Sequence, residues 1–139
     1  MSVCLMNKTH SYPIRIYYED TDAGGIVYYA NHLKFTERAR TEFLRELGFQ
    51  NSTFIEKNNL FIVVRSLCAD YLKPAYLDDS LTISTMVLKV SPARFELSQN
   101  ILRDDDILFK MTVELAAVSK AGIPQRLPAA LKTVLEKFV

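Results

Sequence analysis

The chain has 139 residues, of which 49% are apolar, and its 17 basic and 16 acidic side chains leave a formal net charge of +1. This length fits one domain covering residues 1–139, and the apolar content excludes an intrinsically disordered chain. The charge balance gives no electrostatic reason to expect nucleic acid as a partner, and no apolar stretch approaches the ~20 residues of a transmembrane segment.

The first predicted element is a strand over residues 12–18, in which Ile14 and Ile16 flank the polar Arg15. Alternation of this kind is typical of a strand with one face in water. Residues 1–10 are predicted to form an N-terminal extension, and they lack the apolar core of a secretory signal.

A long helix is predicted over residues 31–47, because this segment contains no Pro or Gly and is rich in helix-favouring side chains. Asn31 is the expected N-cap, and Gly48 is the expected C′ residue. On a helical projection the apolar side chains form a broad arc, so the helix should be buried over much of its circumference, as if a sheet curled around it. The arc consists of Leu33, Phe35, Ala39, Phe43, Leu44 and Leu47.

Arg40 projects into this apolar arc, where a charged group requires a partner. Glu37 lies three residues earlier, within reach on the same side of the helix. Two interpretations remain open from the sequence: a structural ion pair at the edge of the core, or a pair with a catalytic role.

Four further strands are predicted, and short polar connections between them indicate that consecutive strands are neighbours. They cover residues 60–72, 81–90, 94–101 and 107–117. The first is apolar on both faces, which predicts a central strand, with Cys68 as a small buried hydrophobe. Neither Cys68 nor Cys4 has a close Cys or His companion, so no zinc site is expected. A short helix over residues 128–138 completes an α+β domain with a five-stranded antiparallel sheet.

The segment most informative about function lies between the first strand and the long helix. Three carboxylates, Glu19, Asp20 and Asp22, are followed by Gly24 and Gly25. Glycines allow backbone amides to approach a ligand closely, and a helix N-terminus presents unpaired N–H groups. Such donors suit an oxyanion hole, and a neighbouring carboxylate can act as nucleophile or general base on an ester or thioester. The alternatives are a turn with a helix cap, or a divalent-cation loop, although the distal Glu of a calcium site is missing.

The motif YEDTDAGGIVY at residues 18–28 resembles the hotdog-fold acyl-CoA thioesterases of the 4-hydroxybenzoyl-CoA thioesterase type, and most closely their Tol-Pal-associated YbgC branch. The resemblance continues through Ala30-Asn31, ERAR at residues 37–40, YLKPA at residues 71–75 and Asp78-Asp79. It implies a hotdog fold, in which an antiparallel sheet wraps a long central helix. It also implies hydrolysis of an acyl-CoA thioester to free acid and coenzyme A.

The resemblance assigns expected roles to individual residues. Asp22 is implied to be the catalytic carboxylate, and the backbone N–H of Tyr29 to polarise the thioester carbonyl. Gly25 is a possible second N–H donor, and Glu37 is the reserve carboxylate, because other hotdog thioesterases carry theirs on the helix. The remaining candidates are substrate contacts: Ile26, Val27 and Tyr28 beside the acyl group, and Lys89 and Arg94 near the phosphates of coenzyme A.

The resemblance implies no metal and no redox cofactor. It implies a homo-oligomer, either a dimer with paired sheets or a tetrameric dimer of dimers, with active sites between subunits. Acyl-CoA is the expected small-molecule substrate, and an acyl carrier protein is a further candidate partner. The expected location is the cytoplasm, with peripheral association with the inner membrane as a second option.

The sequence departs from the branch it resembles at Tyr29, where that branch generally has His. A phenol has a reference pKa of about 10, against about 6.5 for imidazole, so Tyr29 is a poor general base at neutral pH. The next residues offer little compensation, because the side chain of His32 is expected to point elsewhere on the helix. His10 has no predicted role.

An alternative function is a non-catalytic module that binds acyl-CoA or acyl carrier protein in membrane-lipid metabolism. The position of Asp22 beside Gly24-Gly25 favours the enzyme, because a pure binding protein has no need of a carboxylate near a thioester. A hydratase or dehydratase on the same fold is a third interpretation, and it would require a catalytic His.

Overall fold

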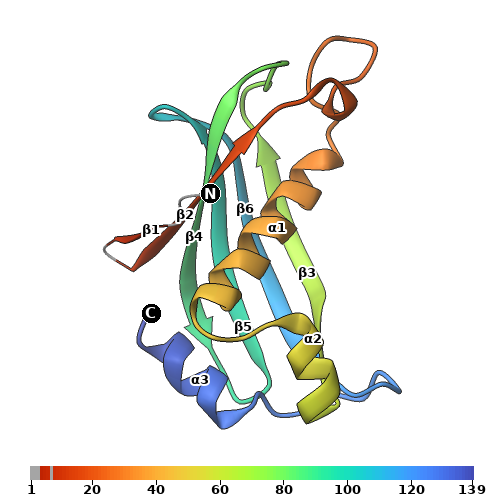
Figure 1. Cartoon of the computed structure of the whole chain (residues 1–139), viewed down its shortest axis with the longest axis vertical. Helices are drawn as coiled ribbons and strands as arrows, with labels where there is room; N and C mark the ends of the chain where they lie inside the picture. Colours follow the sequence, from red (N-terminus) through yellow and green to blue (C-terminus); the bar gives the residue numbers. More distant parts are fainter. Residues whose placement is uncertain (1–3, 7) are drawn as a thin grey trace.

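A long helix, α1, lies across one face of a curved antiparallel sheet in the computed structural model, which describes residues 4–6 and 8–139 (Figure 1). Within these residues the strand order is β1-β2-β4-β5-β6-β3. The strands are β1 Cys4–Met6, β2 Thr9–Arg15, β3 Phe61–Tyr71, β4 Ser80–Val90, β5 Arg94–Arg103 and β6 Asp106–Val118. The helices are α1 Asn31–Glu46, α2 Asn51–Thr53 and α3 Ala129–Glu136, with a 3-10 turn at Tyr18–Asp20 and a π-helical turn at Phe54–Asn58. This arrangement is the expected hotdog fold.

The five predicted strands correspond to β2 to β6, and the short β1 is additional. β1 pairs with β2 inside the predicted extension of residues 1–10, of which residues 1–3 and 7 lie outside the described residues. β2 begins before the predicted strand and ends at Arg15, so the prediction that the strand reaches Tyr18 is wrong. Tyr18 instead opens the 3-10 turn, where its side chain is exposed.

The prediction that residues 60–72 form a central strand is wrong, because β3 lies at the edge of the sheet described here. β3 pairs with β6, so it is not a neighbour of β4, the next strand along the chain. Cys68 on β3 is exposed, which also contradicts its expected burial. The chain therefore covers the apolar pattern of β3 only in part: Ile62 and Ala69 pack against the core, whereas Val63, Val64 and Leu67 are exposed.

The long helix begins one residue away from the predicted cap. Ala30 occupies the N-cap position, and Asn31 is the first helical residue; its side-chain amide donates to the Asp20 carbonyl oxygen at 2.9 Å. Gly48 has a φ of 97°, as expected of a glycine that follows a helix C-cap. The start of the helix is thus tied to the carboxylate-rich turn that precedes it.

The predicted apolar arc of α1 is confirmed in part. Phe35, Ala39, Phe43 and Leu44 are buried, whereas Leu33 is 36% exposed. Leu47 is only partly buried, and the inward face includes the polar His32 and Thr36 in addition. The buried face is therefore rotated toward these two polar residues, because the sheet leaves the Leu33 side of the helix uncovered.

Arg40 finds a different partner from the one the sequence predicts. Its Nη1 donates to Oε1 of the fully buried Gln99 on β5 at 3.1 Å, whereas Glu37 accepts a hydrogen bond from Thr41. Burial lowers the pKa of Arg40, and the nearby Glu37 carboxylate opposes this shift. Among the described residues, the predicted Arg40–Glu37 ion pair is not formed, and the side-chain amide of Gln99 takes the place of the carboxylate.

The predicted C-terminal helix is confirmed as α3, which follows Pro128 at its N-cap. Its Leu131 and Leu135 are fully buried against the main core. None of the helices in residues 4–6 and 8–139 combines the length and the apolarity needed to cross a membrane.

His10 on β2 is fully buried, and among the described residues neither of its ring nitrogens has a hydrogen-bond partner. Its ring packs against Phe43 at a centroid distance of 5.4 Å. Burial lowers the pKa of His10 below 6.5, and the carboxylates of Glu46 and Glu42 only partly oppose this shift. The histidine is therefore neutral in the folded protein near pH 7.

This burial should make the folded state sensitive to mild acid. As the pH falls through about 6.5, the unfolded chain takes up a proton at His10, whereas the folded chain does not. The free energy of unfolding is therefore highest above this pH and declines below it. We expect His10→Phe to flatten the dependence of the free energy of unfolding on pH between about 5 and 7, measured by urea titration. A residual slope from His32, whose pKa is also lowered by burial, should remain. An unchanged slope in the variant would show that His10 is not the responsible group.

Candidate active site

The turn before α1 is organised by its own backbone and by one of its three carboxylates. Asp20 accepts a hydrogen bond from the Tyr17 amide at 2.8 Å, and its carbonyl oxygen accepts from the Tyr28 amide at 3.0 Å. Val27 is anchored to the neighbouring segment through the carbonyl of Ala75 at 2.9 Å. Asp20 therefore holds the loop, and it does not line the cavity that Asp22 borders.

Asp22 borders a cavity of about 480 Å³. Its Oδ1 accepts a hydrogen bond from the Gly24 amide at 2.8 Å, and no ion pair or second hydrogen bond to this carboxylate occurs within the described chain. A Cβ at Gly24 would lie 3.2 Å from that same Oδ1, so glycine suits this close approach. The carboxylate is held by one oxygen while the other is available to a ligand.

Gly25 serves the turn rather than the cavity. It has a φ of 81°, a conformation that glycine adopts without strain. Its N–H donates to the carbonyl oxygen of Asp22 at 3.0 Å. The sequence suggested the Gly25 N–H as a possible oxyanion donor, but in the structure this N–H donates to the Asp22 carbonyl oxygen instead.

The cavity lies where the loop, the first turn of α1 and the end of β3 meet. Its lining consists of Asp22, Ile26, Val27, Tyr28, Tyr29, His32, Tyr71, Leu72, Lys73 and Pro74. Most of these side chains are aromatic or aliphatic, so the cavity offers an apolar surface with one carboxylate and one ammonium at its border. The structure thus brings together the predicted residues Asp22, Ile26, Val27, Tyr28 and Tyr29.

The carbonyl oxygen of Tyr29 accepts hydrogen bonds, whereas its amide N–H has no hydrogen-bond partner among the described residues. The carbonyl accepts from Oη of Tyr71 at 2.7 Å and lies 3.1 Å from Nδ1 of His32. Within the described chain the Tyr29 N–H donates to no other group. An unpaired N–H next to a cavity and at the start of a helix is a suitable donor for a carbonyl oxygen of a ligand.

His32 lines the cavity, so the expectation that its side chain points elsewhere is wrong. It is buried, and its ring lies 4.9 Å from that of Tyr71 and 5.1 Å from that of Phe109. Burial lowers its pKa, opposed by hydrogen bonds to the carbonyls of Tyr29 and Tyr28. The spacing from His32 to Phe35 and Ala39 could have revealed this orientation, because residues three to four apart share a helix face.

Glu37 lies away from the Asp22 cavity. It borders a second cavity of about 430 Å³, whose lining includes Leu33, Val64 and Leu67, beside the exposed edge strand β3. Its Oε1 accepts a hydrogen bond from Thr41 at 3.2 Å. Within one chain the two candidate carboxylates are therefore not brought together.

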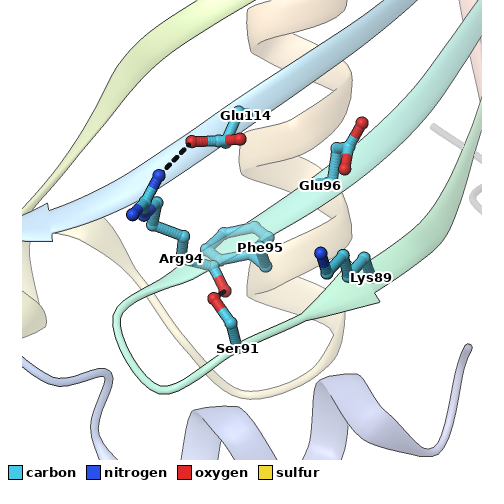
Figure 2. Close-up of a pocket in the computed structure, with 6 residues that line it drawn as sticks. All are labelled: Lys89, Ser91, Arg94, Phe95, Glu96 and Glu114. Carbon is cyan, nitrogen blue, oxygen red and sulfur yellow. Dashed lines mark hydrogen bonds and ion pairs between the residues drawn. The ribbon is translucent and has the colours of Figure 1, made fainter.

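The two candidate phosphate contacts lie at the other end of the sheet. Lys89 and Arg94 flank the turn between β4 and β5, close to α3, whereas Asp22 precedes the start of α1 (Figures 1 and 2). They border a separate cavity of about 250 Å³. Arg94 pairs with Glu114 at 3.1 Å, and Glu114 also pairs with Arg65 (Figure 2 shows the first of these pairs). These bonds lower the pKa of Glu114.

Comparison with known proteins agrees with the fold. The sequence pattern of the thioesterase-like superfamily matches residues 17–137. The acyl-CoA thioesterase YbgC of Haemophilus influenzae is 46% identical over 114 residues, which cover 82% of this chain and 84% of that protein. The acyl-CoA thioester hydrolase YbgC of Escherichia coli O6:H1 is 36% identical over 134 residues, covering 96% and 98%.

A solved structure extends this similarity to three dimensions. The crystal structure of a probable thioesterase from Bartonella henselae superposes with a TM-score of 0.84 at 40% identity, covering 86% of this chain and 99% of that one. The fold and the similarity to these proteins define a hotdog-fold thioester hydrolase. This chain belongs to the thioesterase-like superfamily. The resemblance inferred from the motif at residues 18–28 is thereby confirmed.

Proposed function

We propose that this protein hydrolyses acyl-CoA thioesters to free acid and coenzyme A in the cavity bordered by Asp22. One observation carries the proposal: a carboxylate with an available oxygen and the unpaired N–H of Tyr29 border the same aromatic cavity. The Haemophilus relative is an acyl-CoA thioesterase and the Escherichia relative is an acyl-CoA thioester hydrolase, which supports the choice of substrate.

In this proposal the Tyr29 N–H donates to the thioester carbonyl oxygen as it gains negative charge. Asp22 acts by one of two routes. As a general base it removes a proton from a water molecule that attacks the carbonyl carbon; as a nucleophile it attacks that carbon itself and forms an anhydride, which water then opens. In either route the carbon–sulfur bond breaks, and the thiolate of coenzyme A leaves with the bonding electron pair and takes up a proton.

The remaining cavity residues would bind the acyl group. Ile26, Tyr28, Tyr71 and Leu72 offer apolar surface, while Val27 is buried beneath them and anchors the loop. The scheme needs no metal or redox cofactor, because hydrolysis is redox-neutral and a carboxylate with water supplies the chemistry. Of the two candidates for the coenzyme A phosphates, Lys89 has the freer charge, because Arg94 is paired with Glu114, but neither borders the Asp22 cavity of the same chain.

The test is release of free thiol from short, long and aromatic acyl-CoAs, with acyl carrier protein thioesters as a second carrier, comparing the wild type with Asp22→Asn. Single turnover in ¹⁸O-labelled water tests for the nucleophilic route. Label in the Asp22 carboxylate identifies that route, because it arises only when water opens an anhydride at the Asp22 carbonyl carbon, whereas the general-base route labels only the product acid. Tight binding of every thioester without thiol release would contradict hydrolysis and favour the binding module.

We further propose that two copies of the chain join through their β3 edges. β3 presents an open edge with exposed Val63, Val64 and Leu67, and the cavity beside it reaches the exposed Leu33 of α1. An open, apolar edge strand readily pairs with another strand, and a contiguous apolar surface of this kind is typical of a subunit interface. Antiparallel pairing would extend the sheet across both subunits and cover this surface.

A single charge at this edge should separate the subunits. We expect Leu67→Lys to convert a dimer or tetramer to smaller species by sedimentation velocity, because a buried ammonium without a partner is costly. Leu88→Lys on β4 is the matched control, since both leucines are 43% exposed in the single chain, and it should retain the β3-paired dimer. A Leu67→Lys protein of wild-type size would exclude β3 pairing.

A further inference from the structure

Tyr29, whose N–H is proposed to meet the thioester, is held by side chains from two different elements. Tyr71, the last residue of β3, donates its hydroxyl to the Tyr29 carbonyl oxygen at 2.7 Å. His32, in the first turn of α1, places Nδ1 3.1 Å from the same oxygen. The strand and the helix thus converge on one peptide group at the border of the cavity.

The acceptor fixes the state of both side chains. A carbonyl oxygen can only accept, so the neutral His32 must carry its proton on Nδ1 and present Nε2 as an acceptor. Burial lowers the pKa of His32 and raises that of Tyr71, which keeps the imidazole neutral and the phenol protonated near pH 7. The other titratable groups around the cavity are Asp22, Tyr28, Tyr29 and Lys73.

Packing limits the freedom of these two donors. The ring of Tyr71 lies 4.9 Å from that of His32, and each ring lies close to the fully buried Phe109, at 4.9 Å and 5.1 Å. The contacts of Tyr71 with His32 and with Phe109 are edge-to-face, an arrangement that favours defined ring orientations, and the contact of His32 with Phe109 is tilted. Little movement of either donor is therefore available without disturbing the core.

Both peptide groups that flank Tyr29 are held. The Tyr28 carbonyl accepts from the Asn31 amide at 2.9 Å. A planar trans peptide directs its N–H opposite its carbonyl, so this bond also sets the direction of the Tyr29 N–H. The following peptide is held through the Tyr29 carbonyl by Tyr71 and His32. Rotation about the Tyr29 backbone, which would redirect its N–H, is opposed on both sides.

We propose that Tyr71 and His32 are positioning residues, which clamp the Tyr29 carbonyl from two sides and thereby preorganise the Tyr29 N–H for the thioester oxygen. The inference rests on the proposed function and adds to it two residues outside the loop that carries Asp22. A fixed donor stabilises developing charge without reorganising during the reaction, so losing its support lowers turnover more than binding.

Removing one donor at a time tests the clamp. Tyr71→Phe keeps the ring contacts and removes the hydroxyl; we expect kcat to fall about tenfold while KM stays within about twofold. Tyr76→Phe is the matched control, because Tyr76 is also 47% exposed and does not line the cavity, and it should have wild-type kinetics. An unchanged kcat in Tyr71→Phe would overturn the proposal.

Variants of His32 distinguish positioning from proton transfer. We expect His32→Leu to lower kcat about tenfold, and His32→Asn, whose amide can donate in place of Nδ1, to recover most of it. Because Nδ1–H is present in both protonation states of His32, the acid limb of the kcat–pH profile should be the same in His32→Asn as in the wild type. Loss of that limb would make His32 a proton-transfer group instead and overturn the positioning role.

A spectroscopic measurement on the wild type is independent of turnover and of variant folding. The ¹⁵N chemical shifts of the His32 imidazole at neutral pH should report a proton on Nδ1 and none on Nε2. The opposite tautomer would overturn the clamp. Absence of thiol release by the wild type would instead refute the proposed hydrolysis, and full activity of Asp22→Asn would refute the role of Asp22. In both cases the imidazole shifts would still decide the clamp, so these failures are distinguishable.

Discussion

Asp22→Asn should reduce kcat for acyl-CoA hydrolysis by about 10³-fold, with a much smaller change in KM. The amide keeps the size of the side chain and can still accept from the Gly24 N–H through its oxygen, so the loop should retain its conformation. It cannot remove a proton from water, and it is a poor nucleophile. The measurement is steady-state thiol release on the acyl-CoA that the wild type hydrolyses fastest.

Two variants make this result specific. Glu19→Gln removes an exposed carboxylate three residues away and should leave kcat within about twofold, because Glu19 does not line the cavity. Glu37→Gln tests the reserve carboxylate on α1. A folded but inactive Glu37→Gln protein beside a fully active Asp22→Asn protein would transfer the catalytic role to Glu37.

Gln99→Leu should lower the free energy of unfolding by about 2–4 kcal/mol, because it leaves several buried polar groups without partners. Nε2 of Gln99 donates to the Thr36 carbonyl at 2.9 Å and to Thr85 Oγ1 at 3.0 Å, and its Oε1 accepts from Arg40. This one side chain joins α1 to β4 and β5. The measurement is urea unfolding followed by circular dichroism.

The controls for Gln99 separate polarity from shape. Gln99→Glu keeps an acceptor for the Arg40 guanidinium and should cost less than Gln99→Leu. Gln50→Leu alters an exposed glutamine after α1 and should change the stability by less than about 0.5 kcal/mol. Equal stability of Gln99→Leu and the wild type would show that the buried network contributes nothing to the fold.

The features that the sequence predicted well are those encoded by contiguous residues. The helical periodicity of residues 31–47 predicted α1 and its stop at Gly48, since residues three to four apart necessarily share a face. The alternation along residues 107–117 likewise predicted β6. The turn that holds the Asp22 carboxylate spans only three residues, from Asp22 to Gly24, so its motif could be recognised locally.

The features that the sequence predicted wrongly depend on partners distant along the chain. Residues 60–72 are apolar on both faces, as in a central strand, yet they form an edge because the β3–β4 connection crosses the sheet and leaves β3 beside β6. The partner of Arg40 is Gln99, which is 59 residues away, rather than the predicted Glu37 on the preceding turn of α1. Tyr71 meets Tyr29 from 42 residues away, and no spacing in the sequence indicates that contact.

By itself, the sequence determined the α+β class and the loop that carries Asp22, because periodicity and short-range hydrogen bonds depend on neighbouring residues alone. It indicated the family through the resemblance carried by residues 18–28. Only the tertiary structure decided that β3 is an exposed edge, that His32 faces the cavity and that the Tyr29 amide has no partner among the described residues. These properties follow from which strand pairs with which and from which face of a helix the sheet covers. The strand pairing and the packing of the helix minimise the free energy of the whole chain, so they cannot be predicted from any single segment.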